Sequence, residues 1–273
     1  MDFDTERTKR IQSILLSMMK EIHKIISDNG FTYFLCAGSV LGAVRHNGFI
    51  PWDDDLDIAM PRDDYERFLK IAPSILPNHL YIQHPGNEKK THVMFAKIRL
   101  KNTLFEEEQN KGMNYPRGIY IDIFPIDNIK KNDFVFRTKV KIAKFFKSMF
   151  FLQVRKDKIG IKRLVLPFSY LFPRRFCVWI YKKLCSTNKE TDYRFESLSA
   201  YKFDKVIFKK DVFGKPTLHN FEDTEFFIPE KATEYLKIEY GDFMQLPPVE
   251  KRGIQHSISR LEFIYDDSRY FDK

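Results

Sequence analysis

The chain has 273 residues, of which 43% are hydrophobic, so it can bury the core of one large domain or two small ones. Its 27 Phe and 13 Tyr exclude a chain that is disordered as a whole. Three cysteines, Cys36, Cys177 and Cys185, form no CxxC pair, which argues against a disulfide framework and a structural zinc site and favours a reducing compartment.

The net charge of +9 is concentrated in one segment. Residues 130–190 contain 17 Lys and Arg against 3 Asp and Glu, so the rest of the chain is mildly acidic and this segment calls for an anionic partner. The first residues lack the apolar stretch of a signal peptide, and no run approaches the roughly 18 apolar residues of a spanning helix. We therefore expect a cytoplasmic protein that is neither exported nor integral to a membrane.

Hydrophobic spacing and turn residues divide the first part of the chain into helices and strands. The predicted elements are a helix over Thr5–Asp28 that ends near Gly30, a strand over Phe31–Ala37, a helix over Ser39–Arg45 with Ser39 as N-cap, a strand over Asp55–Met60, and a helix over Arg62–Ile71.

Further strands are predicted at Leu80–Gln83, Val93–Leu100, Leu104–Glu108 and Ile119–Pro125. The pattern then turns helical, basic and aromatic over Asn132–Lys183, and a last helix is expected at Pro229–Ile238. The sequence predicts an α+β protein with a catalytic core over residues 1–130, a basic helical insertion over 131–190, and a C-terminal part over 191–273 that completes the catalytic domain.

The acidic run after Trp52 is the strongest chemical signal. On an extended backbone Asp53, Asp55 and Asp57 point to one face and repel one another, while Asp54 points away from that face. A divalent cation relieves such repulsion, and oxygen ligands favour Mg²⁺ or Mn²⁺. Taken alone, the run fits a solvated acidic turn equally well.

The residues around this run favour the metal interpretation. Gly38 and Ser39 follow a predicted strand and open a helix, where free backbone N–H groups bind phosphate. Asp122 lies between two isoleucines on a later strand, where a buried carboxylate needs a partner such as a metal, although an edge strand facing water would also allow it. Asp127 is a poorer candidate, because Pro125 interrupts that strand.

The stretch Ala37–Ile58, which reads AGSVLGAVRHNGFIPWDDDLDI, resembles the signature of the LicD family. Supporting motifs are Lys97–Arg99, Gly118–Pro125 and Tyr240–Pro248. The resemblance covers roughly residues 20–125 and 220–256, and the basic middle matches in character only.

The resemblance implies a nucleotidyltransferase-like fold of the DNA polymerase beta type, with a mixed sheet flanked by helices. Family members move a phosphorylated alcohol from a CDP-linked donor to a glycan hydroxyl. Bacterial members transfer phosphorylcholine to teichoic acid or lipopolysaccharide, and the animal relatives fukutin and fukutin-related protein use a ribitol phosphate donor. The cysteine zinc finger of the fukutin-related branch has no counterpart here, so no zinc is expected.

We therefore expect metal-dependent transfer of phosphorylcholine from CDP-choline to a cell-surface glycan such as teichoic acid, lipopolysaccharide or capsule. Transfer of ribitol phosphate or glycerol phosphate from a CDP-alditol remains open, as does nucleotidyl transfer to a small alcohol. A non-catalytic nucleic-acid binder would leave the aligned aspartates unexplained, so no nucleic-acid partner is expected.

The family motifs assign roles to particular residues. Metal binding and catalysis fall to Asp55, Asp57 and Asp122, with Asp122 also the first choice for the base. Donor phosphate would contact Gly38, Ser39, Arg45, Lys97 and Arg99. Supporting or substrate contacts would come from Asp53, His46, Trp52, Arg252 and His256. His46 could equally be an ordinary surface charge. Trp52 could stack on cytosine or bind a quaternary ammonium group, but a packing role fits it equally well.

The basic segment Asn132–Lys183 has two interpretations. Its lysines beside Phe and Trp suit the anionic surface of a membrane, which would bring the enzyme to a lipid-linked glycan at the inner face. Alternatively, it is a helical subdomain with aromatic residues in its core and lysines in solvent.

Overall fold

The computed structural model describes residues 3–88, 91–111, 113, 115–130, 134–154, 166–196, 207–253 and 256–264. Within the expected basic insertion, residues 131–133 and 155–165 lie outside this described part. The same holds for residues 197–206 and 265–273 of the expected C-terminal part.

The described helices are α1 (Phe3–Asp28), α2 (Ala37–His46), α3 (Arg62–Ile75), α4 (Phe134–Val154), α5 (Leu166–Ser169), α6 (Arg174–Cys185), α7 (Lys210–Phe213) and α8 (Ala232–Tyr240), with short 3₁₀ turns at Glu108–Asn110 and Val249–Lys251. The strands are β1 (Phe34–Leu35), β2 (Asp57–Pro61), β3 (Leu80–Gln83), β4 (Ala96–Leu100), β5 (Leu104–Glu107), β6 (Tyr120–Ile129), β7 (Tyr193–Glu196), β8 (Ile207–Lys209), β9 (Thr217–Phe221), β10 (Thr224–Ile228) and β11 (Ile258–Glu262).

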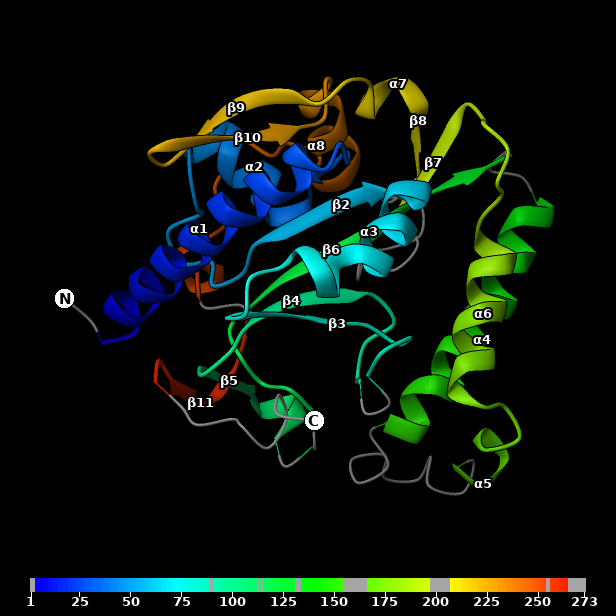
Figure 1. Ribbon diagram of the computed structural model, residues 1–273. Coiled ribbons are helices and arrows are strands. Elements are labelled where there is room, and N and C mark those ends of the chain that lie inside the picture. The colour runs from blue at the N-terminus through cyan, green and yellow to red at the C-terminus, as the bar shows by residue number, and fades with distance from the viewer. Residues whose placement is uncertain are drawn as a thin grey trace.

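A mixed sheet of seven strands forms the centre of the molecule (Figure 1). Its order is β1-β2-β6-β4-β3, and β7 and β8 extend it from the far end of β6. Strands β2 and β6 pair in parallel, whereas the other pairs within this sheet are antiparallel. The expected α+β class, with a mixed sheet flanked by helices, is confirmed.

Helix α1 is amphipathic, as its sequence predicts. Its apolar face is almost fully buried in the main core, at positions that include Ile11, Leu15, Met19, Ile22 and Ile26. The chain leaves the helix through Gly30, whose φ of +68° is the left-handed conformation that glycine adopts without strain.

Two boundaries differ from the prediction in ways that affect the site. Strand β1 contains only Phe34–Leu35, and α2 begins at Ala37, so Ser39 lies inside the helix rather than at its N-cap. Pro125 does not end β6, which continues to Ile129. Strand β6 pairs with β4 only up to Ile123 and with β7 only from Ile126, so the missing N–H of Pro125 falls between its two antiparallel neighbours.

Helices α4 and α6 lie side by side at one end of the molecule (Figure 1). They bury a second, smaller core, which includes Phe136, Phe150, Cys177 and Tyr181. Phe195 of β7 joins this core, so the helical pair is packed onto the sheet. Among the described residues, none of the helices combines the length and apolarity needed to cross a bilayer.

Candidate active site

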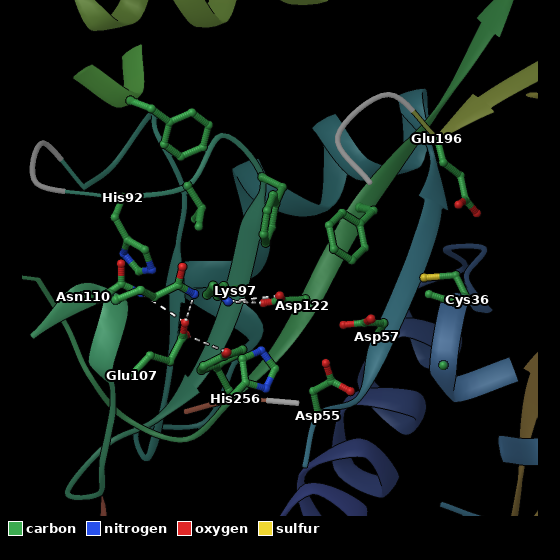
Figure 2. A pocket seen from close by; sticks show the side chains of 18 of the residues that line it. Cys36, Asp55, Asp57, His92, Lys97, Glu107, Asn110, Asp122, Glu196 and His256 are labelled. Atoms are coloured by element: carbon green, nitrogen blue, oxygen red, sulfur yellow. Dashed lines mark hydrogen bonds and ion pairs between the residues drawn. The ribbon is translucent and has the colours of Figure 1, made fainter. Parts of the chain in front are cut away.

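The parallel pairing of β2 and β6 brings two predicted site residues together. Asp57 and Asp122 are direct partners in the register, and neighbouring strands lie about 4.8 Å apart. Figure 2 shows the carboxylates of Asp55, Asp57 and Asp122 gathered in the middle of one cavity. Residues 65 positions apart in the sequence thus form one acidic cluster.

This cavity has a volume of about 380 Å³, within the range of small-molecule sites. It is lined by Cys36, Ala37, Gly38, Asp55, Asp57, His92, Val93, Phe95, Lys97, Glu107, Gln109, Asn110, Tyr120, Asp122, Phe124, Lys147, Phe151, Glu196 and His256. The predicted residues Asp55, Asp57, Asp122, Lys97, Gly38 and His256 are among them.

The electrostatics of the acidic cluster are unfavourable without a further cation. Burial raises the pKa of Asp57 well above its ordinary value, and the charges of Asp55 and Asp122 raise it further. Burial also raises the pKa of Asp55 and of Asp122. The charge of Lys97 opposes these effects only in part, and within the described part of the chain no hydrogen bond to the carboxylate of Asp57 is seen.

Lys97 compensates one member of the cluster. Its Nζ lies 2.7 Å from Oδ1 and 3.0 Å from Oδ2 of Asp122, and also 3.4 Å from the centre of the Tyr120 ring. The lysine is only 3% exposed. Burial lowers its pKa, and the carboxylate of Asp122 opposes that effect. The predicted role of Lys97 beside a donor phosphate is compatible with this position on the cavity wall.

The start of α2 supports the acidic cluster from behind. A Cβ at Gly38 would lie 2.9 Å from Oδ2 of Asp53, so glycine makes room for that carboxylate. Burial raises the pKa of Asp53 to about 9, with the neighbouring charge of Asp55 adding to it. Among the described residues the Gly38 N–H has no acceptor, which leaves it available to an anion at the cavity wall.

Ser39 has a different role from the one predicted. Its hydroxyl accepts a hydrogen bond from the Asp57 backbone N–H at 2.8 Å, and its own N–H donates to the carbonyl of Cys36. It does not line the cavity. Ser39 therefore ties the first residue of β2 to helix α2 instead of capping that helix.

Asp54 and His256 form a contact that the sequence did not predict. Asp54 does not line the cavity; its side chain is fully buried, and its Oδ1 lies 2.9 Å from Nδ1 of His256. Burial alone would lower the pKa of His256, but the bond to Asp54 and the charges of Asp55 and Asp54 raise it to about 9. A charged imidazole from the C-terminal part of the chain thus faces the cavity.

The other predicted basic residues lie elsewhere. Arg45 and His46 occupy the last turn of α2, a helix about 15 Å long whose first turn lines the cavity. Arg45 donates to the carbonyl of Phe243, and the rings of His46 and Trp52 are in edge contact. Arg252 lies over Trp52 at 5.6 Å. Arg45, His46, Trp52 and Arg252 do not line the cavity, so a contact of these residues with the donor stays a prediction.

Arg99 is placed by the predicted strand but does not reach the cavity. It is 1% exposed, and it donates to Oε1 of Gln83 at 2.5 Å and to the carbonyl of Gly118 at 2.7 Å. Although it shares a strand face with Lys97, its guanidinium is occupied by these acceptors. It holds β3, β4 and the start of the Gly118–Pro125 motif together.

Several lining residues were missed by the sequence analysis. Glu107 accepts hydrogen bonds from Tyr120, Asn110 and Gln109 at the β5 end of the cavity (Figure 2). Its place in the acidic run Glu106–Glu108, at the end of a predicted strand, was the available signal. Glu196, at the opposite end, comes from β7, and no sequence pattern pointed to it.

Glu196 is held by a chain of hydrogen bonds that reaches the start of α2. The Tyr235 hydroxyl donates to Glu196 at 3.0 Å and accepts from the N–H of Ala37 at 3.1 Å. Burial raises the pKa of Glu196 to about 7, although the bond from Tyr235 opposes the shift. Ala37 has a φ of +48°, so this chain fixes a strained backbone at the cavity wall.

The donor set suits a hard divalent cation. Among the described residues, no three His, Cys, Asp or Glu side chains already stand around one common ion position. Mg²⁺ does not require this, since it is commonly bound through one or two carboxylates together with substrate phosphates. Asp57, whose carboxylate lies close to those of Asp55 and Asp122, fits that kind of site together with these two residues.

Comparisons with known proteins agree with the motif analysis. A family model described as LicD/FKTN/FKRP, nucleotidyltransferase domain, matches residues 30–175. The lipopolysaccharide cholinephosphotransferase LicD of Haemophilus influenzae is 25% identical over 252 residues, which span 90% of this chain and 94% of that protein. Uncharacterized proteins of Rickettsia typhi and Rickettsia prowazekii are 33% and 30% identical, over 44% and 42% of this chain and 36% and 46% of their own lengths.

The resemblance inferred from the Ala37–Ile58 motif is thereby confirmed. The matched region contains β2, β6 and the three clustered aspartates, and it extends into helix α6. Because the family model covers more than half of the 273 residues, the chain belongs to the LicD/FKTN/FKRP nucleotidyltransferase-domain family.

Proposed function

We propose that this protein transfers phosphorylcholine from CDP-choline to a hydroxyl group of a cell-surface glycan, with Mg²⁺ or Mn²⁺ bound at Asp55, Asp57 and Asp122. The observation that carries the proposal is the cluster of three carboxylates, of buried Asp122 and half-buried Asp55 and Asp57, that face one another in a cavity of substrate size. Like charges held close together lower the stability of the folded protein. Their presence is therefore explained by a metal cation that binds between them.

Family membership makes the chain a transferase of phosphate-containing groups. The printed name of the Haemophilus relative supports choline phosphate as the transferred group and lipopolysaccharide as one type of acceptor. A nucleotidyltransferase-like topology, a core over residues 1–130 completed by the C-terminal part, and a cytoplasmic location belong to the same proposal. Teichoic acid and capsule remain further candidate acceptors.

The aspartate cluster would hold the metal through carboxylate oxygens of Asp55, Asp57 and Asp122. When bound, the ion would neutralise the diphosphate of the donor and the charge that develops on the departing CMP. Asp53, buried behind this group and with its pKa raised by burial and by the charge of Asp55, would orient the first ligand. At the cavity wall, the Gly38 N–H and the ammonium group of Lys97 could donate hydrogen bonds to the phosphates of CDP-choline.

The transfer itself needs one bond to form and one to break. The acceptor hydroxyl oxygen attacks the phosphorus that carries choline, and the bond from this phosphorus to the oxygen of CMP breaks. We assign the hydroxyl proton to Asp122. Neutralising Asp122 would release the charge of Lys97, 2.7 Å away, to the phosphoryl group at the moment when negative charge grows there.

Aromatic residues in the same cavity favour choline over an alditol. The rings of Phe95 and Phe124 have their centres 4.5 Å apart and are tilted by 45°, and Phe151 of α4 also lines the cavity. Phenyl rings attract a quaternary ammonium group but form no hydrogen bonds with the hydroxyls of ribitol or glycerol.

A donor screen tests this proposal directly. Purified protein with Mg²⁺ would be incubated with CDP-choline, CDP-ribitol and CDP-glycerol in turn, and protection against thermal unfolding would identify the donor that binds the folded state. We expect the largest shift with CDP-choline and its loss on adding EDTA. A larger shift with a CDP-alditol would overturn the choline assignment, and equal shifts with and without EDTA would overturn the metal assignment.

The aromatic contribution is tested by substitution of Phe124 with Leu, which removes the ring but keeps an apolar side chain. We expect weaker binding of CDP-choline and unchanged binding of CMP, which lacks the ammonium group. An equal loss for both ligands would mean that Phe124 only supports the cavity wall.

A further inference from the structure

A continuous group of exposed aromatic rings lies on the helical pair at the end of the molecule. We define the aromatic patch as Phe145, Phe168, Phe172, Phe176 and Trp179, from α4, α5, α6 and the turn between α5 and α6. Four of the five are strongly exposed, from 39% for Phe176 to 51% for Trp179. Beside them, Tyr170 and Leu171 are exposed by 56% and 69%.

Direct ring contacts connect the members of the aromatic patch. Phe172 contacts Phe145, Phe168 and Phe176, with ring centres 5.4–6.4 Å apart. Phe176 in turn lies 5.8 Å from Trp179. The exposed rings are therefore neighbours on one surface rather than scattered apolar residues, and a connected apolar surface of this kind marks a contact with another partner.

Positive charge surrounds the patch, and the acidic group described beside it is Glu66, which pairs with Lys182 of α6. The described helices α4, α5 and α6 contain no Asp or Glu. Exposed lysines and arginines next to the patch are Lys141, Lys144, Arg175 and Lys183, and Nζ of Lys183 lies 4.9 Å from the centre of the Trp179 ring. A second copy of this chain would bring the same positive charges against them, which disfavours self-association.

We infer that the aromatic patch docks on an anionic lipid bilayer, with its rings at the interface and its lysines on lipid phosphates. Aromatic side chains beside basic residues are the combination that interfacial binding requires. Phe145 of the patch lies on α4, the helix that also carries Lys147 and Phe151, which line the acidic cavity. Docking would therefore hold that cavity next to the membrane surface, where lipid-linked glycans are found.

This inference goes beyond the proposed reaction and can be tested without donor or acceptor. The chain has two tryptophans, Trp52 and Trp179, so Trp52→Phe leaves Trp179 as the single fluorescent reporter. Vesicles of phosphatidylglycerol and phosphatidylcholine are compared with vesicles of phosphatidylcholine alone. We expect a blue shift of Trp179 emission and flotation of the protein with the anionic vesicles only.

Variants separate the aromatic and electrostatic contributions. Phe168→Ser with Phe176→Ser should weaken partitioning at least about tenfold, since each ring loses its burial in lipid. Lys141→Gln with Lys144→Gln should weaken it about 25-fold at low salt, about fivefold for each charge. The matched control is Leu218→Ser, which removes an apolar side chain with a similar exposure of 48% away from the patch.

Three outcomes would overturn the inference. These are absence of flotation with anionic vesicles, flotation that the Phe168 and Phe176 substitutions leave unchanged, and a concentration-dependent dimer in sedimentation experiments that the same substitutions abolish. The last result would assign the aromatic patch to a second copy of the chain.

Discussion

Aspartates lie at both ends of the parallel pairing of strands β2 and β6, and the two ends are built differently. At one end Asp57 faces Asp122 and receives no hydrogen bond from the described residues. At the other end Asp127, which is fully buried, is held by two nitrogens of Arg62 at 2.7 and 2.8 Å. At the first end Lys97 pairs with Asp122, while the half-buried Asp57 lies between carboxylates; at the second end the single buried carboxylate has an arginine of its own.

This difference distinguishes a carboxylate that binds a ligand from one that stabilises the fold. A buried carboxylate with a fixed, two-pronged arginine is satisfied, and it holds α3 onto the sheet. A buried carboxylate that faces other carboxylates lowers stability and is explained by a ligand that arrives later. The same residue type on the same strand therefore has opposite consequences, and four substitutions can test that reading.

The largest effect is expected for Asp57→Asn. Transfer activity should fall by more than about 100-fold, because a metal ligand is lost, and second-sphere partners alone can cost that much. Stability should rise by about 0.5–2 kcal/mol, because the repulsion from Asp55 and Asp122 is relieved. Product formation and urea unfolding measure the two quantities. Asp63→Asn, at an exposed position of α3, is the control, and near-normal turnover by Asp57→Asn would contradict the metal assignment.

Arg62→Ala should show the reverse pattern. Removing one partner of a buried ion pair costs about 3–5 kcal/mol, because Asp127 would be left charged and unpaired. Activity per folded molecule should be unchanged. Replacing the pair by Arg62→Met with Asp127→Leu should recover much of the lost stability. A large loss of turnover in samples that remain folded would show that Arg62 also serves the reaction.

The third test uses the pH dependence of stability. The pKa of Glu196 rises from 4.5 to about 7 on folding, so between these values the folded protein keeps a proton that the unfolded chain has lost. Its contribution is therefore full below pH 4.5 and is lost as pH rises towards 7, by up to about 3 kcal/mol. Urea unfolding across this range should show the decline, and Glu196→Gln should flatten it. An unchanged slope in the variant would assign the decline to other groups.

The smallest effect is expected for Lys182→Ala. Nζ of Lys182 lies 2.7 Å from Oε1 of Glu66, the same distance that joins Arg62 to Asp127, but the side chains of Lys182 and Glu66 are 41% and 38% exposed. Exposed pairs contribute less than about 1 kcal/mol. A cost as large as that of Arg62→Ala, measured by the same urea unfolding, would mean that distance rather than burial sets the contribution.

Local patterns in the sequence predicted much of this arrangement. The alternation around Asp57 and Asp122 identified two half-buried strands, and the apolar face of α1 and the exact span of β3 followed from spacing alone. The clustering of Asp57 with Asp122 could be anticipated because the family motif links them. Their direct register could not, since it depends on which strands become neighbours.

The errors have a common physical cause: tertiary partners decide what a polar side chain does. Pro125 was expected to end a strand, but it falls where β6 changes neighbours. Ser39 was expected to cap a helix, but Asp57 offers its hydroxyl an N–H. Arg99 was expected at a phosphate, but Gln83 and the Gly118 carbonyl occupy it. No single-strand pattern contains these partners.

The three cysteines have a practical consequence for experiments on this protein. Cys36, Cys177 and Cys185 are all free and buried, and burial raises the pKa of each thiol, so the reactive thiolate is scarce even where Cys36 borders the cavity. A single cysteine introduced at an exposed position such as Leu171 should react with a spin label or fluorophore far faster than the natural thiols. The natural cysteines should therefore contribute little label when the depth and orientation of the protein at a bilayer are measured by site-directed labelling.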